Sequence, residues 1–196
     1  MQLTPDERAR VQAALAAAQA RTEARFALMI VPVSDRYAMY PLAWAGMVAL
    51  AVAAALALFW QTIGLRLGFL LEAAAFGLIA VATEWRPLHL ALVPKRLKQM
   101  RARTMAHREF AAGILAAHDK KEGLLFFAAL AEHYVEIVAS REVHARVGAE
   151  AWARIVSDFT TRAKSGNLAN AFISAIEACA YHLQTHFPPM SAEPPA

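Results

Sequence analysis

The chain has 196 residues, of which 58% are hydrophobic and 18% charged, and its formal net charge is +4. This length accommodates one domain of about 100–150 residues plus an anchor, and it excludes two full domains with a transporter core. Cys179 is the single cysteine, which excludes an intrachain disulfide and a multi-cysteine metal site. The first two dozen residues do not resemble a cleaved signal peptide.

The first predicted element is a helix near the amino terminus. Thr4 is its expected N-cap, Pro5 its first helical residue and Glu7 the partner in a capping box. The apolar run "FALMIVPV", residues 26–33, follows and is too short to cross a membrane. We therefore expect a buried strand there.

Two longer apolar runs come next, at residues 42–60 and 67–83. The first has no charged residue and approaches the roughly 20 residues that a membrane-spanning helix needs. Because the connection between the runs is short, they predict a transmembrane helical hairpin over residues 41–85. Lys and Arg concentrate on both flanks, so the positive-inside rule predicts an integral inner-membrane protein with two spans and both termini cytoplasmic.

Polar and small residues within this hairpin raise further alternatives. Glu72 would be costly inside hydrocarbon unless it reached water or a partner. Its position near the outer interface favours water, and the alternative is a contact with a partner subunit of a transport complex. Small residues recur every fourth position from Ala45, a stripe that packs the hairpin against itself or, alternatively, supports a homo-oligomer.

A long basic helix is predicted over about residues 94–117. Its basic residues are Lys95, Arg96, Lys98, Arg101, Arg103 and Arg108. A sequence pI of about 9.5 invites a nucleic-acid interpretation. A polybasic segment directly after a membrane span is better explained by anionic lipid headgroups, so membrane lipids are the predicted partner and nucleic acid is not.

The remaining elements suggest a soluble-type sheet with helices. The runs 123–130 and 134–140 predict two strands joined by a turn at Glu132 and His133. Amphipathic helices follow at about 152–163 and 169–183, and residues 188–196 have the composition of a disordered tail. Because the first of these strands is apolar on both faces, it needs sheet neighbours and helices on each side, and the two ends of the chain must share one core.

This order of elements resembles the TPM domain. The residues that carry the resemblance are "FALMIVPVSDRY", "GLLFFAALAEHYVEIVASREVHARV" and "SGNLANAFISAIEA", and it covers roughly residues 4–40 and 105–187. The resemblance implies an α/β fold class, with a three-layer α/β/α domain built on a small mixed sheet. The inserted two-helix transmembrane hairpin would place this chain in a bacterial, membrane-anchored subset of the family. The expected organisation divides at residues 1–40, 41–85, 86–187 and 188–196.

The family is linked to acid phosphatase activity, metal binding and accessory roles around membrane complexes. A metal or acidic site would use Asp35, Glu132 and Glu150, and Ca or Mg would be its cation, since hard cations take several oxygen ligands. This acidic cluster is depleted relative to the family pattern. His182 and His186 stand four apart and could supply two further metal ligands, but no third ligand is apparent.

The sequence therefore predicts a non-catalytic interaction or assembly and maintenance module at the inner face of the membrane. Its partner would be another membrane protein or complex, and no cofactor is expected. The alternative is a metal-dependent phosphatase of the TPM type, and the third interpretation is a small subunit of a transport complex acting through Glu72.

Overall fold

The computed structural model describes residues 3–33, 39–59, 64–83, 93–116 and 122–189. The chain divides into two compact units. The first comprises residues 1–34 and 99–196, and the second comprises residues 35–98. Each is described by itself. The predicted tail and Asp35 lie outside the described residues, except for the first two positions of the tail.

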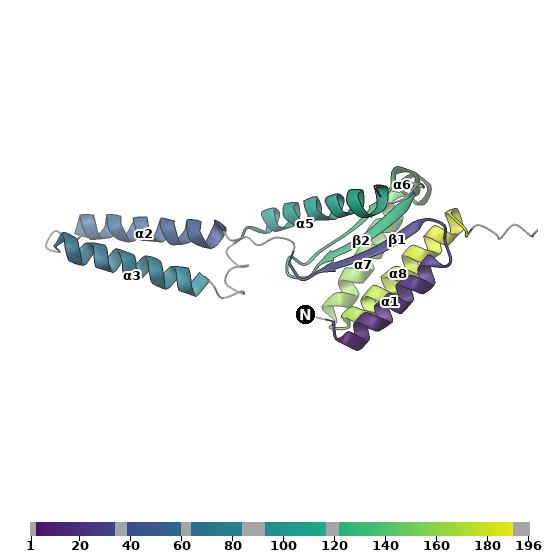
Figure 1. The fold of residues 1–196 in the computed structure, drawn as a ribbon, viewed down its shortest axis with the longest axis horizontal. Helices are drawn as coiled ribbons and strands as arrows, with labels where there is room; N and C mark the ends of the chain where they lie inside the picture. The colour runs from purple at the N-terminus through teal and green to yellow at the C-terminus, as the bar shows by residue number, and fades with distance from the viewer. Residues whose placement is uncertain (1–2, 34–38, 60–63, 84–92, 117–121, 190–196) are drawn as a thin grey trace, which may run out of the picture. The chain divides into compact units, whose positions relative to one another are not determined.

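The first unit is built on a three-stranded sheet in the order β1-β2-β3 (Figure 1). Strand β1 spans Arg25–Val31, β2 spans Gly123–Ala129 and β3 spans Tyr134–Ala139. β1 is parallel to β2, and β3 is antiparallel to β2. The predicted strands are confirmed, and so is the prediction that the two ends of the chain share one core.

One face of this sheet is covered by α1 (Pro5–Gln19), α7 (Ala149–Lys164) and α8 (Leu168–His186) (Figure 1). Phe126 of β2 meets the rings of Phe159 and Phe172 at centroid distances of 5.3 and 6.1 Å. Aromatic contacts of this edge-to-face kind add to the stabilisation from buried area. Cys179 of α8 is fully buried in the same core, and this burial raises the pKa of its thiol.

Helix α5 (Lys95–Phe110) covers the opposite face and continues into a π-helical turn, Ala111–Leu115. Its buried side chains, Ala102, Ala106 and Phe110, pack with the β2 side chains that point to this face. Every residue of β2 is buried, because helices cover both of its faces. The prediction of a mixed α/β unit with a small sheet is therefore confirmed.

Local hydrogen bonds explain where two of the helices begin. The backbone N–H of Glu7 donates to the hydroxyl of Thr4, and the N–H of Thr4 donates to the Glu7 carboxylate, so the predicted capping box is confirmed. The hydrogen bonds that the N–H and the hydroxyl of Thr4 donate to the Glu7 carboxylate lower the pKa of Glu7. Helix α6 (Arg141–Val147), which the sequence reasoning missed, begins at Ser140, whose hydroxyl accepts from the N–H of Val143 at 3.4 Å.

The second unit contains α2 (Met39–Phe59) and α3 (Leu65–Thr83), which pack against each other. Ala45 and Ala49 of α2 are buried, which agrees with the small-residue stripe packing the two helices together. Large apolar side chains of both helices are exposed, among them Met47, Leu50, Leu58, Phe69, Leu78 and Val81.

Among the residues that the structure describes, no helix is both long enough and apolar enough to span a membrane. Helix α3 carries Arg66 and Glu72, and charged side chains are costly within hydrocarbon. The predicted fold class is therefore wrong in its inserted transmembrane hairpin. The predicted localisation, a two-span inner-membrane protein with cytoplasmic termini, is wrong for the same reason. The role predicted for Glu72 stays a prediction.

Gly123, the first residue of β2, lies against the π-helical turn and provides a test of the packing. A Cβ added there would collide with the Ile114 side chain and would lie 3.2 Å from the carbonyl oxygen of Arg25. Overpacking of this kind costs about 1–3 kcal/mol, so Gly123→Ala should lower the free energy of unfolding by that amount in chemical denaturation. Gly113→Ala is the matched control, because nothing lies within 4 Å of its added Cβ. Equal stabilities of the two variants would contradict this packing.

Candidate functional site

Strand β1 lies at the edge of the described sheet, beside α1. The N–H of Arg25 donates to the carbonyl of Glu122, and the carbonyl of Val31 accepts from Leu130. In this register the odd-numbered residues of β1 bond to β2, so the backbone groups of Phe26, Leu28 and Ile30 point to the outer edge. The side chains of these three residues point to the face that α1 covers.

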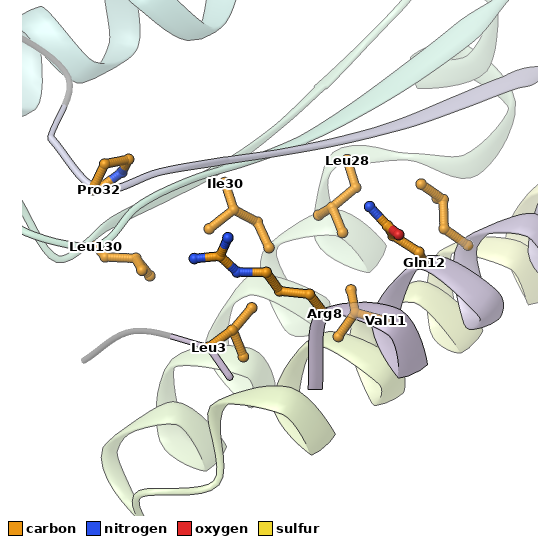
Figure 2. Close-up of a pocket in the computed structure, with 9 residues that line it drawn as sticks. Leu3, Arg8, Val11, Gln12, Leu28, Ile30, Pro32 and Leu130 are labelled. Carbon is orange, nitrogen blue, oxygen red and sulfur yellow. The ribbon is translucent and has the colours of Figure 1, made fainter. Parts of the chain in front are cut away.

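A groove of about 530 Å³ runs between α1 and β1 (Figure 2). We call it the α1–β1 groove. Its lining residues are Leu3, Arg8, Val11, Gln12, Leu15, Leu28, Ile30, Pro32 and Leu130. A second hollow of about 690 Å³ shares Gln12, Leu15 and Leu28 and extends toward the beginning of β1. The groove is lined mainly by aliphatic side chains, as is usual for binding sites.

Arg8 and Gln12 are the polar side chains of the groove, and both come from α1. Figure 2 shows the Arg8 guanidinium reaching from α1 to lie near Ile30 and Leu3. Within the described part of the chain, no carboxylate lies within ion-pair distance of Arg8. An arginine in an aliphatic groove is suited to bind the carboxylate of a ligand, because its planar group can donate two parallel hydrogen bonds.

Gln19, at the end of α1, orders the beginning of β1. Its side-chain oxygen accepts from the outward-facing N–H of Phe26 at 2.7 Å, and its side-chain nitrogen donates to the carbonyls of Ala24 at 3.0 Å and Thr22 at 3.3 Å. The amide of Gln19 thus takes the place that a neighbouring strand would occupy at Phe26. It fixes one end of the α1–β1 groove.

The carboxyl ends of β1 and β2 meet at the other end of this groove. The N–H of Ala131 donates to the carbonyl of Pro32 at 3.1 Å, which ties the β2–β3 turn to the chain leaving β1. Glu132 lies in this turn and is only 8% exposed, and His133 follows it with a φ of 50°. Asp35, whose position is not described, comes shortly after β1 in sequence.

Glu150 lies elsewhere. It is near the beginning of α7, where its side chain is 92% exposed and lies 3.9 Å from Arg154. The next turn of this helix contacts the last turns of α8, since the ring of Trp152 lies 6.0 Å from that of His182. The end of α8 adjoins the segment before β1, where Thr22 donates to the carbonyl of Phe187 at 2.7 Å. The length of β1, about 20 Å, therefore separates Glu150 from Glu132.

The predicted metal ligands do not converge within the described residues. No group of three His, Cys, Asp or Glu side chains that could hold a metal ion occurs there. His182 and His186 lie in the last turns of α8, where burial lowers the pKa of His182 and nearby His186 and Arg154 lower it further. The metal site at Asp35, Glu132 and Glu150 and the His182–His186 pair stay predictions.

A polar cluster that the sequence reasoning missed lies between α5 and β3. Glu136 has its carboxylate 3.4 Å from the ring nitrogen of His107 and 3.7 Å from Arg103, and it accepts from the hydroxyl of Tyr134 at 2.8 Å. Burial, and then the hydrogen bond to Glu136, raise the pKa of Tyr134. The signal in the sequence was a single charged residue in the middle of a strand. Arg103, for which a membrane-surface role was predicted, lies in this cluster, and that role stays a prediction.

The other basic residues of the predicted lipid-binding helix lie on α5 or at its start. Lys95, Arg96, Arg101 and Arg108 are exposed, and Lys98 is half-buried. Their predicted role at a membrane surface stays a prediction, as does the absence of nucleic acid among the partners.

The fold and this edge of the sheet define a small mixed α/β domain with a groove beside its first strand. Residues 89–181 match the model of a family described as the TPM domain. This match includes α5, β2, β3, α6, α7 and most of α8, so the resemblance seen in the sequence is confirmed for the second part of the chain. The chain matches no curated protein and no solved structure.

Gln19→Ala tests how the end of the groove is held. The substitution leaves the N–H of Phe26 and the carbonyl of Ala24 without their partners, and each unsatisfied buried group costs about 1–3 kcal/mol. The free energy of unfolding should fall by about 2 kcal/mol in urea denaturation. Gln12→Ala, on the same helix, removes an exposed side chain and should change the free energy of unfolding by less than about 0.5 kcal/mol. A larger loss for Gln12→Ala would contradict this assignment.

Proposed function

We propose that this chain is a TPM-type interaction module that binds a segment of a partner protein in the α1–β1 groove. The observation that carries the proposal is the groove itself, an aliphatic hollow of about 530 Å³ along an edge strand, with Arg8 reaching into it. The module acts by binding, and its role is the assembly or maintenance of a protein complex.

The arrangement of the groove supports a protein partner rather than a compact metabolite. The two hollows follow α1 and β1 from Pro32 to Glu23, so the lined surface is long and narrow. An extended chain fits such a surface, and aliphatic side chains on both walls can bury apolar side chains of a ligand. Each fully buried aliphatic side chain contributes about 1.5–3 kcal/mol to such binding.

Recovery of a partner with groove variants tests this function. Leu28→Asp places a charge on the aliphatic wall, so a partner protein that co-purifies with the tagged full-length chain should be recovered at least about tenfold less, as measured by quantitative mass spectrometry. Tyr181→Asp is the matched control, because Tyr181 is a 65% exposed side chain on α8 outside the groove. The unfolding transitions of both variants are first compared with that of the unsubstituted chain, to establish that both are folded. Equal recovery with the two variants would overturn the proposed site.

The second candidate function is a metal-dependent phosphatase of the TPM type. One observation favours it, since the sheet brings the turn that contains Glu132 to the chain leaving β1, which leads to Asp35. Two acidic residues from these segments would supply oxygen ligands to Ca²⁺ or Mg²⁺, and the ion would polarise a phosphate ester.

Two glutamate variants distinguish this candidate. If it holds, Glu132→Gln lowers the rate of p-nitrophenyl phosphate hydrolysis in Mg²⁺ or Ca²⁺ by at least about 100-fold, because a charged ligand is lost. Glu150→Gln leaves the rate unchanged, because Glu150 lies at the far end of the domain. A full-length chain that hydrolyses no phosphate ester and binds neither cation in calorimetry would exclude the candidate.

A further inference from the structure

We propose that the partner segment binds as an additional β-strand on the outer edge of β1, with one of its carboxylates on Arg8. This inference rests on the proposed function and specifies the chemistry of the partner, an extended segment with apolar side chains at alternate positions and an acidic group near one end. Such strand addition is a recurring mode of peptide recognition.

The backbone of β1 provides the first argument. The N–H and C=O groups of Leu28 and Ile30 point away from β2, and within the described residues no strand pairs with this edge. At Phe26, the equivalent position at the start of the strand, Gln19 already accepts from the outward N–H. The edge thus accepts hydrogen-bond partners in strand geometry, and the positions at Leu28 and Ile30 can take those of a ligand.

The contrast between the two edges of the sheet provides the second argument. Edge strands are usually protected against unwanted pairing by inward-pointing charges, prolines or bulges. β3 carries such a charge at its centre, Glu136, held between α5 and the strand by Arg103 and His107. β1 has no charged residue between Arg25 and its end at Val31. The unprotected edge is the one that faces the α1–β1 groove.

The groove provides the third argument and indicates which kind of segment binds there. Alternate side chains of an added strand point to the same face as Leu28 and Ile30, into the hollow between β1 and α1. Arg8 lies at the Ile30 end of this hollow, so an acidic group of the ligand meets it there. A second copy of this chain is a poorer fit, since its β1 would bring no acidic residue to Arg8 and would bring its own α1 to the same edge.

Selection of peptides against the full-length chain tests the inference. The probe is a display library of random twelve-residue peptides, and the affinities of the selected peptides are then measured by fluorescence anisotropy. We expect peptides with apolar residues at alternate positions and one Asp or Glu. Leu28→Pro removes an outward N–H that no described group uses, and it should weaken binding at least tenfold beyond Leu28→Ala, which keeps that N–H.

Arg8→Gln tests the acidic contact in the same assay. It should weaken binding about tenfold, and replacing the peptide's acidic residue by its amide should cost about tenfold with the original chain and little with Arg8→Gln. Arg162→Gln, an exposed arginine of α7 outside the groove, is the control and should leave binding unchanged. Unfolding transitions of all variants are compared first.

The outcomes separate this inference from the proposed function. Peptides with apolar residues at helical spacing, equal effects of Leu28→Pro and Leu28→Ala, or self-association of the chain through β1 would each overturn strand addition. A selection without groove-dependent peptides would overturn it as well. If Leu28→Asp still lowers the recovery of a co-purifying partner in these cases, binding in the groove stands without the added strand.

Discussion

The parallel pairing of β1 with β2 is the constraint on which the first unit depends. It joins residues 25–31 to residues 123–129, and it places fully buried β2 at the centre of the sheet. Without β1, the apolar side chains of β2 would lack a neighbour on one edge, and α1 would have no strand to pack beside. The same pairing creates the α1–β1 groove, because it leaves β1 as an edge strand facing a helix. Fold and candidate site therefore have one origin.

Much of this fold was predictable, because each element depends on short-range patterns. The capping box at Thr4 and Glu7 fixed the start of α1, and the apolar runs at 26–33 and 123–130 predicted strands that must share a core. Helix α6 was missed because seven residues carry too little periodicity. The transmembrane interpretation began from hydropathy, and apolar runs of this length lie at the lower limit for a span. Hydropathy alone does not distinguish a helix surrounded by lipid from one that packs against another helix.

The candidate site was less predictable, because it depends on tertiary placement. Glu132 and Glu150 were grouped as acidic residues near strand ends, but the antiparallel strand β3 returns the chain to the opposite end of the sheet before α6 and Glu150. Arg8 was not predicted as a site residue, because it is one arginine among several on an exposed helix. Its significance depends on the aliphatic walls that β1 and the turn at Leu130 provide, and these come from distant parts of the chain.

The half-buried charge in β3, Glu136, has a consequence for how many chains can join one assembly. A sheet with two open edges templates linear growth, since every added strand presents a new edge to the next molecule. Glu136, held near Arg103 and His107, disfavours the pairing of a further strand with β3. If an extended ligand adds to β1 as proposed, it would therefore complete the sheet at its other edge, with one ligand per chain.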